Sequence, residues 1–90
     1  MFEWDENKNR RNIEKHGVSF ELASRIFENR VVTYFDTRFD YGELREVSIG
    51  TVDGILILAV VHTDRDGNIR LISARPAKRK EKEIYDQAIR

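Results

Sequence analysis

The side chains that could do chemistry in this sequence are those of arginine, lysine, histidine and tyrosine, and cysteine is absent. The two histidines lack the spacing of metal ligands, so we expect neither a metal site nor a cofactor. The sequence also lacks a phosphate-binding glycine loop, a serine elbow and an HExxH motif. Cationic, imidazole and phenol groups suit metal-independent RNA cleavage, in which the 2′-hydroxyl attacks its own phosphate. That reaction needs only a base, an acid and cationic stabilisation of the phosphorane.

Arg75 is the first candidate for this chemistry, because it directly precedes a segment rich in lysine and arginine. A guanidinium is well suited to phosphate because its planar fork binds two oxygens at once. We predict that Arg75 and Arg70 bind and stabilise the scissile phosphate, and that His62 or Tyr85 moves the protons. A structural role stays open for each proton carrier: His62 bonded to a loop carbonyl, and Tyr85 in the core.

The net charge is zero, with 16 basic and 16 acidic side chains, but the charges are unevenly distributed. Residues 70–90 hold seven basic and three acidic side chains, whereas residues 31–69 hold three basic and seven acidic ones. The basic segment could bind a phosphate backbone and the acidic one a basic partner. A solvated helix face would explain the basic segment equally well.

Length and apolar content limit the possible architectures. A chain of 90 residues suits one compact domain, residues 1–90, with a single core. The longest apolar run, residues 55–61, is far too short to span a membrane, and the first residues lack the apolar part of a secretory signal. We therefore expect a soluble cytoplasmic protein.

The apolar pattern predicts the elements that position the candidate residues. Asp5 can cap a polar helix that ends near Gly17 and lies on the surface, and Ser19 can cap a second helix that ends near Asn29. Strands are expected at residues 2–4, 31–35, 45–52, 55–61 and 69–74, followed by a last helix over residues 78–90. This order predicts an α+β fold: a small, mainly antiparallel sheet with two N-terminal helices and one C-terminal helix.

The Asp53-Gly54 dipeptide favours a two-residue hairpin turn and thereby predicts a strand register. With a five-residue loop at the next turn, Arg45, His62 and Arg70 would form one row across three strands. Helices should cover the face above that row, which includes residues 47, 49, 58, 60 and 74. The opposite face would carry small and polar side chains, with residues 59, 61, 73 and 75 among them. It could be an open floor or take another helix.

Three segments, FEWDENKNRRNIEKHGVSFELA, YGELREVSIG and HTDRDGNIRLISARPAKRKEKEIY, resemble in this order the BrnT family of type II toxins. They cover nearly the whole chain, and Pro76 is a departure from the family pattern. The resemblance implies a RelE-like ribonuclease fold and ribosome-independent RNA cleavage that arrests growth. It also implies a BrnA-type ribbon-helix-helix antitoxin, in a two-plus-two complex that represses the operon through operator DNA.

The resemblance also directs attention to particular residues. Those on motif positions are Lys15, His16, Arg45, Arg65, Arg70, Arg75, Glu81 and Tyr85. The predicted RNA-binding side chains are Lys15, Arg45, Arg65, Lys78 and Arg79. The leading hypothesis is thus an endoribonuclease toxin that is neutralised by a co-encoded antitoxin. The alternative is a non-catalytic module that binds a DNA-binding antitoxin and acts as a co-repressor.

Overall fold

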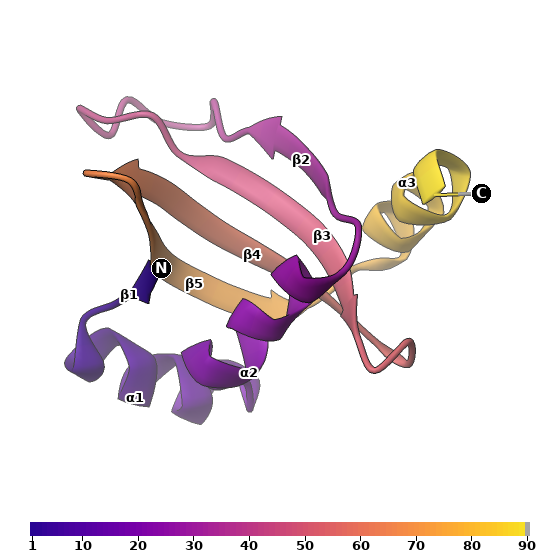
Figure 1. The fold of residues 1–90 in the computed structure, drawn as a ribbon, viewed down its shortest axis with the longest axis horizontal. Helices are drawn as coiled ribbons and strands as arrows, with labels where there is room; N and C mark the ends of the chain where they lie inside the picture. Colours follow the sequence, from indigo (N-terminus) through magenta and orange to yellow (C-terminus); the bar gives the residue numbers. More distant parts are fainter. Residues whose placement is uncertain (90) are drawn as a thin grey trace.

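The computed structural model describes residues 1–89, and its elements form an α+β fold, as predicted (Figure 1). The elements are β1 (Phe2–Glu3), α1 (Glu6–His16), α2 (Phe20–Ser24), the 3-10 helix η1 (Arg25–Glu28), β2 (Val32–Phe35), β3 (Glu46–Val52), β4 (Leu56–Arg65), β5 (Asn68–Pro76) and α3 (Arg79–Ile89). Arg90, the last residue of the expected final helix, lies outside the described residues. No helix within residues 1–89 is long and apolar enough to cross a membrane.

The sheet has five strands in the order β1-β5-β4-β3-β2, and it is mixed. β1 pairs in parallel with β5, whereas the other three pairs are antiparallel. The expectation of a small, mainly antiparallel sheet is therefore corrected. A strand of two residues carries too little pattern to reveal its partner. Its position here is fixed by the Phe2–Ile69 pairing and by the Ile69 N–H, which donates to the Met1 carbonyl.

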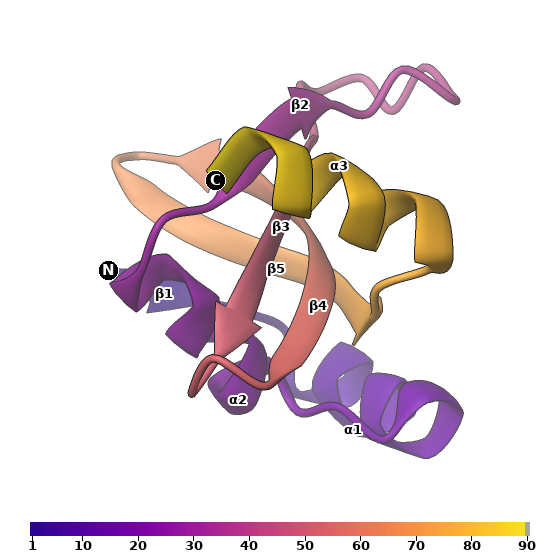
Figure 2. The ribbon, with the colours of Figure 1, turned by 90° about the vertical axis from the view of Figure 1, so that its right-hand side faces the viewer.

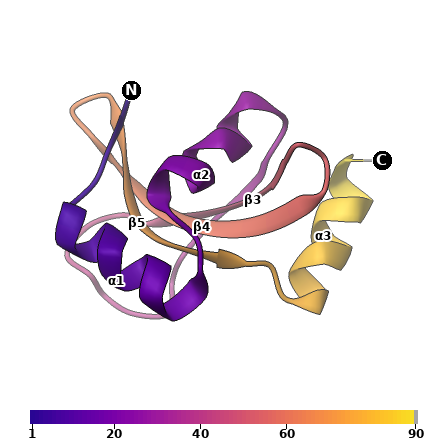
Figure 3. The same cartoon turned by 90° about the horizontal axis from the view of Figure 1, so that it is seen from below.

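The helices lie on both faces of the sheet, and this also corrects the expected arrangement. Figure 2 shows the strands between α3 on one side and α1 and α2 on the other. The larger core cluster joins α2 and η1 to β4 and β5, through buried side chains such as Phe20, Ile26 and Leu58. A second cluster on the opposite face joins α3 to β3, through Tyr85 and Ile49. Figure 3 shows α3 set apart from the other helices, after the end of β5.

The start signals of the first two helices are confirmed. The Asp5 carboxylate accepts from the backbone N–H groups of Asn7 and Lys8, and Gly17 ends α1 with φ of 70°. The Ser19 hydroxyl accepts from the Leu22 N–H. The second helix is shorter than predicted, because α2 tightens into the 3-10 turns of η1 after Ser24.

Buried asparagines attach α1 to the rest of the molecule, so the helix is not the loosely held surface element that its polar sequence suggests. Asn12 donates to the carbonyls of Val18 and Ala74, at 2.8 and 2.7 Å, and accepts from the Ala74 N–H. Asn9 accepts from the Phe20 N–H at 2.8 Å. Asn9 and Asn12 are buried, whereas Ile13 is exposed. Satisfied amides therefore take the place of an apolar stripe.

Both hairpins differ from the predicted register. Asp53 and Gly54 have the expected positive φ, but β3 pairs Val52 with Leu56, leaving Ile55 as an extra residue outside the ladder. This shift of one residue moves every β3 side chain to the other face. Val47 and Ile49 therefore share a face with Ala59 and Val61 of β4, on the side of α3. The prediction that Val47 and Ile49 share a face with Leu58 and Val60 is therefore wrong.

The predicted row of Arg45, His62 and Arg70 does not form. The second turn has two residues, Asp66 and Gly67, instead of five, and an irregularity follows between Val61 and His62. His62 consequently lies opposite Glu46 and Leu71, whereas Arg70 lies opposite Thr63.

Candidate functional site

An open cleft of about 580 Å³ lies on the sheet face that α3 covers only in part. Its floor consists of small side chains from the three central strands: Val47, Ala59, Val61 and Ser73. Ala59, Val61 and Ser73 belong to the face for which the sequence left two alternatives, an open floor or a covering helix. Val47 lies opposite Val61, the place expected for Glu46, because of the shift in β3.

Cationic groups surround this floor from three directions. Lys15 and His16 come from the last turn of α1, Arg38 from the loop after β2, and Arg75 from the end of β5. Two carboxylates, Asp36 and Glu81, also line the cleft, against the three cations of Lys15, Arg38 and Arg75. Among these five side chains there is one excess positive charge, which favours an anion such as phosphate.

Arg75 is held in place by Glu81 of α3. Its two terminal nitrogens donate to the two carboxylate oxygens at 2.7 and 2.9 Å, and one of them also donates to the Pro76 carbonyl. These hydrogen bonds raise the pKa of Arg75 and lower that of Glu81. Glu81 also accepts from the Lys78 N–H at 2.7 Å, which ties the start of α3 to the pair. Three of the five Arg75 N–H groups are used in this way, and two remain for a ligand.

Tyr34 of β2 brings a phenol to the same cleft. Burial raises its pKa, and the negative charge of Glu81 acts in the same direction. The hydroxyl is therefore protonated at neutral pH and can donate a hydrogen bond to a bound oxyanion.

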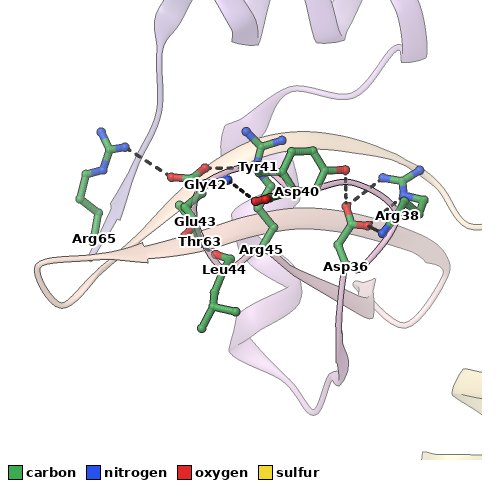
Figure 4. Close-up of polar contacts among 10 residues, drawn as sticks. All are labelled: Asp36, Arg38, Asp40, Tyr41, Gly42, Glu43, Leu44, Arg45, Thr63 and Arg65. Atoms are coloured by element: carbon green, nitrogen blue, oxygen red, sulfur yellow. Dashed lines mark hydrogen bonds and ion pairs between the residues drawn. The ribbon is translucent and has the colours of Figure 1, made fainter.

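Asp36 fixes the loop that follows β2 (Figure 4). Its carboxylate accepts from Arg38 through two nitrogens, at 2.9 and 3.0 Å, and from the Tyr41 hydroxyl at 3.0 Å. These hydrogen bonds, the one from Arg38 first among them, lower the pKa of Asp36 to about 2. The pKa of Arg38 is raised by the same pair. Two-thirds of the Arg38 side chain is exposed, so the arginine presents its charge at the mouth of the cleft while its fork stays oriented.

The two predicted proton carriers lie outside this cleft. His62 is only 6% exposed. Its Nε2 shares a hydrogen bond of 2.7 Å with the Ser48 hydroxyl, and its ring packs edge-on against Phe27. Burial lowers its pKa. Tyr85 packs with Ile49 in the second core cluster and borders a separate hollow near the β3–β4 turn. Tyr85 therefore takes the core position that the sequence left open as its alternative. His62 is bonded to a side-chain hydroxyl of β3, and not to a loop carbonyl as its alternative supposed.

The other predicted arginines are engaged elsewhere. Arg70 pairs with Glu3 of β1 at 2.9 Å. Arg45 and Arg65 both pair with Glu43, at 3.1 and 3.8 Å. Lys78 and Arg79 are exposed at the start of α3, and neither lines the cleft. Of the residues predicted to handle phosphate or RNA, the structure brings Arg75 and Lys15 together.

His16, Tyr34 and Arg38 line the cleft, although the sequence reasoning did not select them for it. His16 adjoins Lys15 on a motif position, which was a usable signal. Tyr34 lies opposite Val47, so a correct β3 register would have revealed it. Arg38 lies in an irregular loop, and nothing in the sequence indicated where its side chain points.

No group of three or more histidine, aspartate or glutamate side chains within residues 1–89 could hold a metal ion.

Together these features define a small α+β protein with an open cleft that carries an excess of positive charge. A family model described as the ribonuclease toxin BrnT of type II toxin–antitoxin systems matches residues 4–81. The chain therefore belongs to the BrnT family, whose type II designation implies a protein antitoxin as partner. The 1.1 Å crystal structure of the Brucella abortus ribonuclease toxin BrnT is similar, with a TM-score of 0.65 and 30% sequence identity. That match covers 88% of this chain and 99% of the Brucella chain, and no curated protein matches the sequence.

Proposed function

We propose that this chain is a metal-independent endoribonuclease toxin that cleaves RNA in the cleft between α1, β5 and the loop after β2. The observation that carries the proposal is the Arg75 guanidinium, held by Glu81 beside an open floor with Lys15 and Arg38 nearby. The floor is formed by small side chains, so a ribose-phosphate backbone could approach the guanidinium closely. Membership of a family described as ribonuclease toxins supports the same reaction.

In the proposed reaction, the 2′-oxygen attacks the adjacent phosphorus as it loses its proton. The bond from phosphorus to the 5′-oxygen breaks as that oxygen gains a proton, which leaves a 2′,3′-cyclic phosphate and a 5′-hydroxyl. Arg75 stabilises the charge on the phosphorane through its two free N–H groups. His16 replaces His62 and Tyr85 as the proton carrier, because it is the imidazole that lines the cleft. The protonated Tyr34 hydroxyl donates to a phosphorane oxygen.

The biological setting follows from the same proposal. Cleavage of cytoplasmic RNA would stop translation and growth. A co-encoded BrnA-type antitoxin of the ribbon-helix-helix class would neutralise the toxin in a two-plus-two complex, and this complex would bind operator DNA through the antitoxin. Two helices and α3 packed against one sheet are compatible with the RelE-like fold that the resemblance implies.

The test is an RNA cleavage assay with purified protein in EDTA. We expect Arg75→Ala to lower kcat about 10²- to 10³-fold, the usual effect of losing one donor to a transition-state oxyanion. Arg75→Lys keeps the charge without the fork and should recover only part of the rate. Arg25→Ala is the matched control, since Arg25 also pairs with a carboxylate, that of Asp53, but lies outside the cleft.

Two results would count against the proposal. Folded Arg75→Ala that cleaves at the wild-type rate would remove Arg75 from the mechanism. Wild-type protein that leaves every RNA intact in EDTA, yet still binds its antitoxin, would favour the non-catalytic co-repressor. The zero net charge of the chain is the observation that keeps this alternative in view, because free RNA-binding domains are usually basic.

A further inference from the structure

A second hollow, of about 490 Å³, lies beside the cleft in the loop that joins β2 to β3. Three residues, Phe35, Asp36 and Thr37, line both spaces. The hollow and the cleft are therefore adjacent, so that neighbouring parts of one bound chain can reach both.

The loop exposes apolar side chains to an unusual degree. Phe35, Phe39 and Leu44 are 61%, 68% and 75% exposed, and all three line the hollow. Adjacent exposed apolar groups of this size on a small protein mark a binding surface. Phe35 and Phe39 supply flat rings, which we call the aromatic platform.

The loop that carries the platform is held by many side-chain contacts (Figure 4). Beyond the Asp36 pair with Arg38, the Arg45 guanidinium lies 3.9 Å over the Tyr41 ring, and the Thr63 hydroxyl donates to the Leu44 carbonyl. The Asp36 N–H also donates to the Arg45 carbonyl at 2.8 Å, which closes the base of the loop. A loop anchored in this way loses little conformational entropy when it binds.

The acidic residues of the loop do not make it repel a polyanion. Asp36 is paired with Arg38, and Glu43 is paired with both Arg45 and Arg65. Asp40 accepts from the Gly42 N–H. The loop and Arg65 together contribute three carboxylates and three guanidinium groups, so the net charge around the platform is close to zero.

We propose that the aromatic platform stacks the base of a nucleotide next to the scissile phosphate. The inference rests on the proposed function, because it takes the cleft to hold RNA. RNA is the ligand that we infer, because the hollow adjoins the cationic cleft and because a nucleobase stacks on an aromatic ring without carrying a charge. Stacking of one base on an aromatic side chain changes affinity about 5- to 150-fold.

The test uses a single-stranded oligonucleotide in which every ribose is 2′-O-methylated, so that it lacks the attacking hydroxyl. One position at a time carries 2-aminopurine, whose fluorescence is quenched by stacking. We expect quenching at one or two adjacent positions, and Phe39→Ala should abolish it and weaken binding by 5-fold or more. Phe39→Trp should retain both. Ile55→Ala, which removes an even more exposed apolar side chain at the β3–β4 turn, should change neither.

Phe39→Leu separates a base from a protein partner. Leucine keeps apolar area but has no aromatic face, so it should weaken RNA binding like alanine if the platform stacks a base. The inference is overturned if Phe39→Leu and Phe39→Ala bind the oligonucleotide as tightly as the wild type. It is also overturned if these variants change only the affinity for the antitoxin.

The same measurements keep the inference apart from the proposed function. Quenching that depends on Phe39, in a protein that never cleaves the unmodified RNA, would refute the endoribonuclease and support the platform. Cleavage that proceeds with no dependence on Phe39 would support the endoribonuclease and refute the platform.

Discussion

Replacing Glu81 with glutamine should lower the free energy of unfolding at pH 7 by about 1–2 kcal/mol while α3 still forms. Glu81 accepts two hydrogen bonds from Arg75 and one from the Lys78 N–H. Glutamine keeps one acceptor oxygen, which can still close the first turn of α3. It cannot accept the second Arg75 donor, and it carries no charge.

The magnitude follows from the burial of the pair. Hydrogen bonds to charged groups contribute about 1.5–3 kcal/mol, and water competes here because 30% of the Arg75 side chain is exposed. We therefore place the loss near the lower end of that range. In a domain of this size it corresponds to a fall in Tm of about 5–15 °C. Guanidinium chloride unfolding, followed through Trp4 at the edge of the core, measures it.

The pH dependence provides a second readout. The Arg75 hydrogen bond lowers the pKa of Glu81, so its stabilisation is fully present above the ordinary value of 4.5. It is lost as the pH falls through the lowered value in the folded state. The difference between wild type and Glu81→Gln should be constant from pH 7 to 5 and shrink towards pH 3.5.

Glu83→Gln is the matched control, since Glu83 pairs at 3.8 Å with Arg79, whose side chain is almost fully exposed. It should leave the midpoint almost unchanged. The reasoning fails if Glu81→Gln unfolds at the wild-type midpoint at pH 7, or if the difference persists at low pH.

Three further predictions concern the framework around the cleft. Asn12→Ala removes three buried hydrogen bonds and should cost roughly 3 kcal/mol in urea unfolding; a loss below 1 kcal/mol would contradict the role of these bonds. Gly50→Ala places a Cβ 2.9 Å from Val31 Cγ1 and 3.0 Å from Ile26 Cβ, so we expect destabilisation of about 1–3 kcal/mol, whereas an unchanged Tm would mean that these neighbours can move. Burial lowers the pKa of His62, so its neutral form contributes stability fully above about pH 6.5 and progressively less below it. Urea unfolding at pH 7.5 and 5.5 should show this loss, and His62→Gln should reduce the slope.

Local sequence signals predicted those parts of the fold that depend on a few neighbouring residues. Asp5, Gly17 and Ser19 mark helix ends by hydrogen bonds and backbone geometry within one turn, and each occupies its predicted position. The polar sequence of α1 was misleading for a physical reason. Hydropathy counts Asn12 as a surface residue, although its amide is buried against the backbone of β5.

Strand register depended on a detail that periodicity does not contain. The Asp53-Gly54 turn has the expected conformation, and Val52 accepts from the Ile55 N–H as in a two-residue hairpin. The ladder nevertheless resumes at Leu56. One extra residue in the turn moves all the side chains of β3 to the other face of the sheet. For this reason Tyr34 could not be placed at the cleft from the sequence, since it reaches that face through its pairing with Val47.

The amide of Asn12 has a mechanical consequence for the cleft. It forms hydrogen bonds with the backbone carbonyl and N–H of Ala74, the residue just before Arg75. In α1, Asn12 also lies one turn before Lys15 and His16. The distance between His16 on α1 and Arg75 on β5 is thus set by hydrogen bonds from the Asn12 amide to the backbone, and depends little on the packing of the hydrophobic core. Substitutions that create a cavity around Leu58 should therefore lower the Tm while the distance between His16 and Arg75 stays the same.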